Sequence, residues 1–275
     1  MNVAHFVKQD LKQFMRNRWL LVFGLLFALV ATGLMVFGGS SHSSYEGFNR
    51  TTASLLNANL FLIPLIVFIV GGVTLSNDKE EGHFGLLLTY PVSYAALIVS
   101  KILSLILALI VMLLLGYGIA AVAGYFLAVP MAPGSFLTFF FLSWILVMCL
   151  APLSIMMGLY CSSKFQAMGA SLLLWAVLVL FYEFVVMALT DIVPAYMLTM
   201  FLTWIVALNP VELMRVLAIV ILDGGTTFGP SLYDFTLFVT EGFGIVIFVV
   251  GILLWILIPS LISYYLIRKG YGYAK

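Results

Sequence analysis

Few side chains in this sequence could do acid–base, nucleophilic or metal chemistry, and they stand far apart. The three histidines, His5, His42 and His83, lie outside the long apolar runs, which excludes an intramembrane haem or zinc site of the usual ligands. No HExxH motif and no GxxxxGK[ST] phosphate loop occurs, so neither a metalloprotease nor an ATP-binding chain is predicted. Ser171 stands in a Gly-Ala-Ser-Leu segment that superficially resembles a serine-nucleophile turn, but no base is near it. We therefore expect no catalytic residue, no metal site and no cofactor in this chain.

Glu183 is the one charged residue inside an apolar run long enough to cross a membrane. It lies about six residues, or roughly 9 Å of helix, from the outer end of that run. A carboxylate at such a depth must be protonated, paired or facing a water-filled cavity. Two interpretations stay open: a hydrogen bond to a neighbouring helix or to the interface, and a wall position in a translocation cavity.

Small residues in the apolar runs are expected to serve packing. Cys149 and Cys161 lie about 18 Å apart along one predicted helix, so they cannot form a disulfide within it. Gly116, Ala120 and Gly124 form a small-residue ladder that permits close helix approach, either within the bundle or between two copies. The 13 methionines form no repeated Met-x-x-Met array, so they indicate adaptable packing rather than a copper relay.

The elements that must position these residues are membrane-spanning helices. The chain is 64% hydrophobic and 8% charged, with a mean hydropathy of +1.20. A bilayer crossing needs roughly 20 apolar residues. No Asp, Glu, Lys, Arg or His occurs between Lys101 and Lys164, so this stretch must cross twice, with a turn at Pro130 to Gly134. We expect residues 1–275 to form one all-α membrane domain.

Hydropathy predicts six crossings: Trp19–Phe37, Leu55–Leu75, Leu97–Ala128, Phe136–Cys161, Ala167–Leu189 and Phe243–Ile267. Six crossings place both termini on one side. The basic residues on that side are Lys8, Lys12, Arg16, Arg18, Lys79, Lys101, Lys164, Arg268, Lys269 and Lys275. Only Arg50 and Arg215 fall on the other side, and this asymmetry predicts that both termini are cytoplasmic.

The connection over residues 190–241 contains two apolar runs, Tyr196–Leu208 and Val211–Leu222, separated by Asn209-Pro210. Each run is too short to span the bilayer alone. As one helix they would place Pro210 and the charges that follow it in the bilayer centre, at a cost of several kcal/mol. We prefer two short helices that dip into the outer leaflet and return. The acidic residues of this outer connection are Asp191, Glu212, Asp223, Asp234 and Glu241.

Residues 1–18 read as a basic amphipathic helix. Apolar residues recur at helical spacing, namely Val3, Phe6, Val7, Leu11, Phe14 and Met15, and polar residues occupy the other face. Such a helix suits the cytoplasmic membrane surface. It is either a simple topogenic anchor or an elbow that braces the bundle.

The cytoplasmic loop at residues 76–96 has the most structured sequence outside the spans. A charged cluster that includes Glu80 and Glu81 is followed by three leucines, Leu86 to Leu88, and then by Tyr90-Pro91. Pro91 should end one short helix and precede the next. The result is a short helix across the cytoplasmic face, which is either a docking element for a motor subunit or a plain amphipathic connector.

This loop resembles the coupling loop of type-2 ABC transporter (ABC-2) permeases. The resemblance rests on the Glu-Glu-Gly, Leu-Leu-Leu and Tyr-Pro-Val-Ser segments followed by Lys101. Arg16–Leu21, the loop and Leu208–Arg215 are similar to the permease of the transporter that serves nitrous-oxide reductase maturation. His83-Phe84 and Tyr94 depart from the usual loop pattern, which indicates a motor subunit with a differently tuned groove.

The resemblance implies half of a transporter in the bacterial inner membrane, with two copies of this chain and two cytoplasmic ATPases that bind ATP and Mg. The chain itself would not be an enzyme and would bind no nucleic acid. The implied ATPase-coupling residues are Glu80, Glu81, Gly82, Leu86, Leu87, Tyr90 and Pro91. A periplasmic accessory protein of the nitrous-oxide reductase pathway would cap the outer face. The matching contact candidates are Asn209, Pro210, Glu212, Arg215 and Asp223.

Other functions stay open beside maturation of the copper–sulfur centre of nitrous-oxide reductase. A permease that exports a peptide, lipid or antibiotic would lack the periplasmic accessory partner. A secondary transporter driven by an ion gradient would need Glu183 and no ATPase, and Glu183→Gln would then abolish transport. A membrane scaffold without transport would tolerate any substitution in the loop from Glu80 to Pro91.

Overall fold

The computed structural model describes residues 3–16, 18–38, 50–88, 93–127, 133–190, 192–222 and 242–270, and all regular structure in these ranges is helical. This confirms the all-α prediction for the described part of the chain. The helices are α1 (Val3–Met15), α2 (Arg18–Gly38), α3 (Arg50–Phe68), α4 (Thr74–Glu80), α5 (His83–Leu88), α6 (Tyr94–Phe126), α7 (Pro133–Tyr160), α8 (Lys164–Ala176), α9 (Tyr182–Thr190), α10 (Ala195–Ala207), α11 (Pro210–Ile221) and α13 (Gly242–Arg268). Two π-helical segments, η1 (Ile69–Val73) and η2 (Val177–Phe181), join α3 to α4 and α8 to α9.

Five of these helical rods are long and apolar enough to cross a membrane, and two bent pairs raise that number to as many as seven. The five rods are Thr51–Glu80, Tyr94–Phe126, Gly134–Tyr160, Lys164–Leu189 and Gly244–Arg268. The bent pairs are α1 with α2, at 62°, and α10 with α11, at 119°. The chain is therefore a multi-pass membrane protein, as predicted. Asn209-Pro210 separates two short helices, as the proline suggested.

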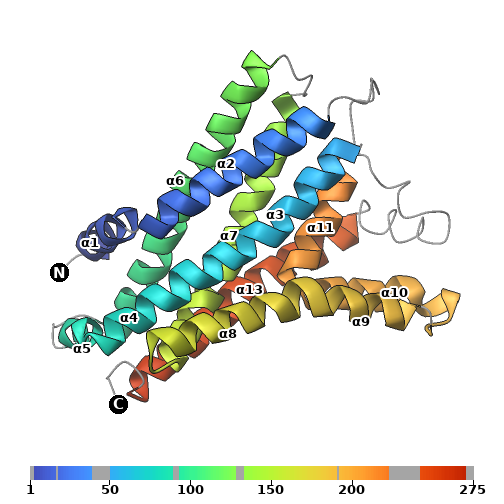
Figure 1. Ribbon diagram of the computed structural model, residues 1–275. Coiled ribbons are helices and arrows are strands. Elements are labelled where there is room, and N and C mark those ends of the chain that lie inside the picture. Colours follow the sequence, from blue (N-terminus) through green and yellow to red (C-terminus); the bar gives the residue numbers. More distant parts are fainter. Residues whose placement is uncertain are drawn as a thin grey trace.

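The rods lie side by side, and the C-terminal end of α13 lies at one end of the bundle (Figure 1). The helices α1, α4 and α5 lie at this end too, whereas α10 lies toward the opposite end. Side chains of α6 fill the centre, with Leu105, Leu109 and Leu113 fully buried. The rod from α8 to α9 and the helix α13 leave most of their apolar surface exposed in the single chain, as expected where lipid or a second chain replaces water.

Gly71 in η1 makes a close contact between helices. A Cβ atom there would lie 2.7 Å from Leu105 Cδ2 and 3.0 Å from Ser154 Cβ, and closer still to the Ser154 hydroxyl. The π-helical segment is held from a third side by Ser171, whose hydroxyl donates a 3.0 Å hydrogen bond to the Phe68 carbonyl. Ser171 is buried in this role, as a structural residue of the α3–α8 contact.

The small-residue ladder of α6 packs inside the bundle. A Cβ atom at Gly116 would lie 2.6 Å from the Phe27 ring, and one at Gly124 would lie 3.9 Å from the Met35 side chain, so the ladder faces α2. Ala120 is fully buried between them. Of the two interpretations, packing within the chain is the one observed. The two cysteines are free and buried, as expected.

Candidate functional site

The Glu-Glu-Gly motif of the cytoplasmic loop is the C-terminal cap of α4. The Glu81 amide donates to the Asn77 carbonyl and the Gly82 amide to the Lys79 carbonyl, at 2.9 and 3.0 Å. Gly82 has a φ of 76°, a left-handed conformation that glycine adopts without steric cost and that commonly ends a helix. The chain turns there and begins α5 at His83, so the motif sets the angle between α4 and the short helix.

The short helix α5 anchors one side chain in the bundle and presents others to solvent. Phe84 is almost completely buried, whereas Leu86 is 63% exposed. Glu81 and His83 are also exposed, with Glu81 Oε2 3.3 Å from His83 Nδ1. Among the other predicted coupling residues, Glu80 is exposed, Gly82 and Leu87 are half-buried, and Tyr90 and Pro91 lie outside the described residues.

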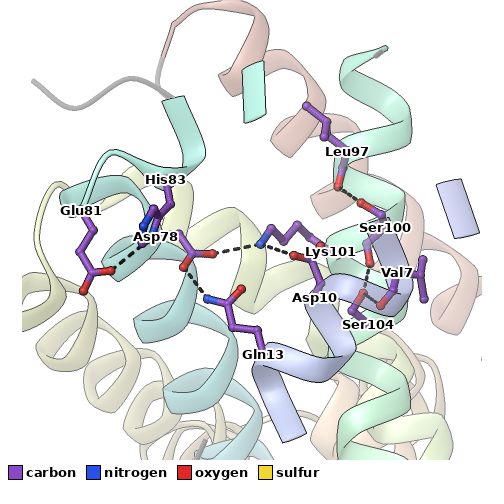
Figure 2. A network of polar contacts seen from close by, with 10 residues as sticks. All are labelled: Val7, Asp10, Gln13, Asp78, Glu81, His83, Leu97, Ser100, Lys101 and Ser104. Atoms are coloured by element: carbon purple, nitrogen blue, oxygen red, sulfur yellow. Dashed lines mark hydrogen bonds and ion pairs between the residues drawn. The ribbon is translucent and has the colours of Figure 1, made fainter. Parts of the chain in front are cut away.

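Beneath α5, three helices meet at a buried ammonium group. Lys101 Nζ on α6 donates to Asp10 Oδ1 on α1 at 2.8 Å and to Asp78 Oδ2 on α4 at 3.0 Å (Figure 2). Gln13 Nε2 on α1 donates to Asp78 Oδ1 at 2.8 Å, so α1 and α4 are also joined directly. Lys101, Asp78 and Asp10 are 4%, 3% and 6% exposed. We call Asp10, Lys101 and Asp78 the charge triad.

The charge triad holds more negative than positive charge when all three groups are ionised. Burial raises the pKa of Asp10, the adjacent Lys101 ammonium lowers it, and Asp78 adds to the rise, with a net result above the ordinary value. A proton on Asp10 would make the triad neutral. Removing a partner from a buried charged pair is costly because the remaining charge has neither water nor a counterion.

The opposite side of α4 is bound to the junction of α7 and α8. Lys79 Nζ donates to the carbonyl oxygens of Leu159 and Cys161 at 2.5 and 2.8 Å, which satisfies acceptors at the C-terminal end of α7. The Ser76 hydroxyl donates to the Ser163 carbonyl at 3.1 Å, and the Lys164 amide donates to Glu80 Oε2 at 2.9 Å. The segment below α5 is thus held by α1 and α6 on one side and by α7 and α8 on the other.

Sequence reasoning missed the charge triad. It treated Lys101 as a marker of topology and did not assign Asp10 a partner. A signal was present in α1, since Phe6, Asp10 and Phe14 follow one another at four-residue spacing and share the buried face of the helix. An acidic residue in an apolar stripe and a lysine at the start of an apolar run are candidate partners in an ion pair.

At the other end of the bundle, Asn209 fastens the break between α10 and α11. It is fully buried; its Oδ1 accepts from the Val211 amide at 2.9 Å and its Nδ2 donates to the Leu178 carbonyl in η2 at 2.7 Å. The carbonyls at the end of α10 are bound as well: Tyr182 donates to Ile205 at 2.6 Å and Trp255 to Ala207 at 3.2 Å. The turn therefore carries its own hydrogen-bond partners, as a turn surrounded by lipid must.

Glu183 has a cationic partner. It forms an ion pair with Arg215 of α11, and Arg215 Nε also lies 3.5 Å from Glu212 Oε2. The Glu183 side chain is 44% exposed and paired, and its place in a translocation cavity stays a prediction. Asn209, Pro210 and Glu212 are buried in the single chain, and Asp223 lies outside the described residues. Contact of these residues with an accessory protein stays a prediction.

We expect Asn209→Ala to lower the free energy of unfolding by about 2–3 kcal/mol, because it removes a helix cap worth about 1 kcal/mol and leaves the buried Leu178 carbonyl unpaired. SDS titration of the purified protein in mixed micelles measures this. Asn57→Ala, at an exposed position of α3, is the matched control and should change little. Equal effects of the two substitutions would show that the Asn209 bonds contribute nothing.

Comparison with known proteins assigns the chain to a family. The sequence model of the family described as "ABC-2 family transporter protein" matches residues 4–269. The "Probable ABC transporter permease protein NosY" of Pseudomonas aeruginosa is 31% identical over 217 residues, which cover 76% of this chain and 78% of that protein. Its namesake from Stutzerimonas stutzeri is 28% identical over 221 residues, covering 78% and 80%. The chain belongs to the ABC-2 family and is the membrane-spanning permease of an ABC transporter.

Proposed function

We propose that this permease pairs with a second copy of itself and with two cytoplasmic ATPase subunits, and that the ATPases drive it through α5. The observation that carries the proposal is the exposed helix α5, which stands on a segment held by four other helices. A force applied at Leu86 would pass through α4 into α1 and α6 by the charge triad and into α7 and α8 by Lys79. Rigid coupling of this kind is what a separate motor needs.

We propose that the chain crosses the membrane six times, which suits a permease driven from the cytoplasm through α5. We assign the crossings to α2, to the rod from α3 to α4, to α6, to α7, to the rod from α8 to α9 and to α13. The pair α10–α11 is then a re-entrant hairpin of the outer leaflet. Its 119° bend and the buried bonds of Asn209 support that assignment. The basic residues of α1, α4 and the start of α8 support an orientation with α5 and both termini in the cytoplasm, and we propose the inner membrane of a bacterium as the location of the protein.

ATP and Mg would be bound by the partner ATPase, and we expect no cofactor in this chain. Among the residues that the structure describes, no group of three or more His, Cys, Asp or Glu side chains is arranged to hold a metal ion.

The pathway that we propose is maturation of the copper–sulfur centre of periplasmic nitrous-oxide reductase. The two NosY relatives and the resemblance of Leu208–Arg215 to that permease support it. In this setting a periplasmic accessory protein would bind the outer face around α10 and α11. Export of a peptide, lipid or antibiotic by the same fold is the alternative.

Purification from native membranes in mild detergent, followed by mass spectrometry, tests both the coupling to an ATPase and the proposed maturation pathway. An ATPase together with a periplasmic copper-pathway protein would support the whole proposal. An ATPase without such a protein would support the permease role and favour the export alternative. If no ATPase co-purifies, even after crosslinking at α5, the coupling role is rejected.

In the same experiment, Leu86→Asp should reduce the recovered ATPase at least tenfold, because a charge replaces the exposed apolar side chain that is best placed to enter a groove of the motor. Ser162→Asp adds the same charge at an exposed position of the α7–α8 junction and is the control. Equal ATPase recovery with the two variants would show that α5 is not the docking element.

A further inference from the structure

We propose that Lys101 is a positioning residue that joins α1 and α4 into one moving body, so that a displacement of α5 by the ATPase also displaces α1 and the start of α2. The inference rests on the proposed function, because it assumes that a motor acts on α5. In this proposal the N-terminal helix α1 takes part in transmitting the movement of α5.

The first support is the origin of the charged groups. Asp10, Asp78 and Lys101 come from α1, α4 and α6, which lie far apart in the sequence and converge at this point (Figure 2). Gln13 adds a direct bond from α1 to Asp78. Both carboxylates thus bind the same ammonium group, and α1 and α4 have a second link that does not pass through it.

The second support is the way in which α1 is seated. Phe6 and Phe14 are 3% and 2% exposed, and the Ser104 hydroxyl of α6 donates to the Val7 carbonyl at 3.3 Å. The two phenylalanines of the apolar face of this amphipathic helix are therefore covered by protein. Because only two residues lie between the end of α1 at Met15 and the start of α2 at Arg18, a shift of α1 must act on the first turn of α2.

The third support is the cost of the alternative. If α4 moved while α1 stayed in place, Lys101 would have to leave one carboxylate behind in a site without water. Buried charges that lose their partners are strongly destabilising, whereas movement of the three helices together keeps every bond. Packed elements joined in this way shift as units.

The test uses the complete transporter in lipid nanodiscs and compares hydrogen–deuterium exchange without nucleotide and after trapping with ADP and vanadate. With wild-type protein, trapping should change exchange both in the α4–α5 peptide and in the α1–α2 peptide. In Asp10→Asn/Lys101→Met/Asp78→Asn, which removes all three charges at once, the α1–α2 response should fall to half or less while the α4–α5 response persists. Lys101→Arg should retain both responses.

A reversible crosslink provides a second, matched comparison. Gln13→Cys and Asp78→Cys, in a background of Cys149→Ala and Cys161→Ala, place two thiols where the two side chains now touch. The oxidised protein should show the full α1–α2 response, and the same sample after reduction should show half or less.

Each outcome decides a separate question. An α1–α2 response that is equal in the wild type and the neutral variant, or as large in the reduced as in the oxidised crosslink variant, overturns the positioning role. No trapping response at α4–α5 in any sample would reject the proposed function itself.

Discussion

Gly71→Ala is expected to lower the free energy of unfolding by about 2–3 kcal/mol, which lies toward the upper end of the range for overpacked cores. The added methyl group would collide with Ser154 and with Leu105. The end of the Leu105 side chain can rotate away, but the Ser154 Cβ atom is fixed to α7 and cannot. Since η1 leads directly into α4, the displaced segment is the one that carries the coupling helix.

The control for this prediction is Gly118→Ala on α6, where a Cβ atom meets nothing within 4 Å. That substitution should leave stability unchanged or raise it by up to about 1 kcal/mol, because alanine is the better helix former. SDS titration of both purified variants measures the difference.

Ser154→Gly removes the Ser154 atoms that a methyl group at Gly71 would meet and leaves only the contact with the end of the Leu105 side chain, which can rotate away. The pair Gly71→Ala/Ser154→Gly should therefore be more stable than the sum of the single changes predicts, with a coupling of at least about 1 kcal/mol. Strictly additive effects would show that the two helices do not contact each other at Gly71.

The helices themselves were predictable from the sequence because the bilayer leaves few alternatives. Backbone groups in lipid must bond within their own helix, so a long apolar run becomes a helix of nearly the same length. The sixth predicted run, Phe243–Ile267, became α13 with bounds one residue wider at each end. The break at Asn209-Pro210 was equally readable, because proline can begin a helix and cannot continue one.

The partners of polar residues were not predictable in the same way. The Glu183–Arg215 pair joins residues 32 positions apart, and the Lys101–Asp10 pair spans 91 positions. Such pairs depend on which helices become neighbours, and hydropathy carries no information about that. The π-helical segments were also missed. Other helices contact them at Gly71 in η1 and at Leu178 in η2, and hydropathy does not predict such contacts.

Lys101→Met is expected to cost about 3–5 kcal/mol of stability, the range measured when one partner of a buried ion pair is removed. The substitution nearly preserves the volume of the side chain, so the loss is one of charge rather than packing. Asp10 and Asp78 would then face each other without a cation, in a site where neither reaches water. Lys8→Met, at an exposed position of α1, the helix that carries Asp10, is the control and should cost less than about 1 kcal/mol.

The neutral triad variant tests whether Lys101→Met destabilises the protein because it leaves buried charges unpaired. Asp10→Asn/Lys101→Met/Asp78→Asn should recover most of the stability that Lys101→Met loses, because no charge is left buried and unpaired. If Lys101→Met costs no more than Lys8→Met, or the neutral variant is no more stable than Lys101→Met, the charge triad does not hold the three helices together.

The stability loss caused by Lys101→Met should depend on pH, whereas a loss caused by a packing defect should not. Burial already raises the pKa of Asp10, and loss of the Lys101 ammonium removes the group that opposes this rise. The folded variant then binds more protons than the unfolded chain, so its stability falls as pH rises through the interval between the unfolded and folded pKa values. SDS titration of Lys101→Met at pH 5 and pH 8 should therefore show the larger loss, relative to wild type, at pH 8. A loss that is equal at both pH values would mean that Asp10 binds no additional proton, and that water or a rearranged donor replaces Lys101.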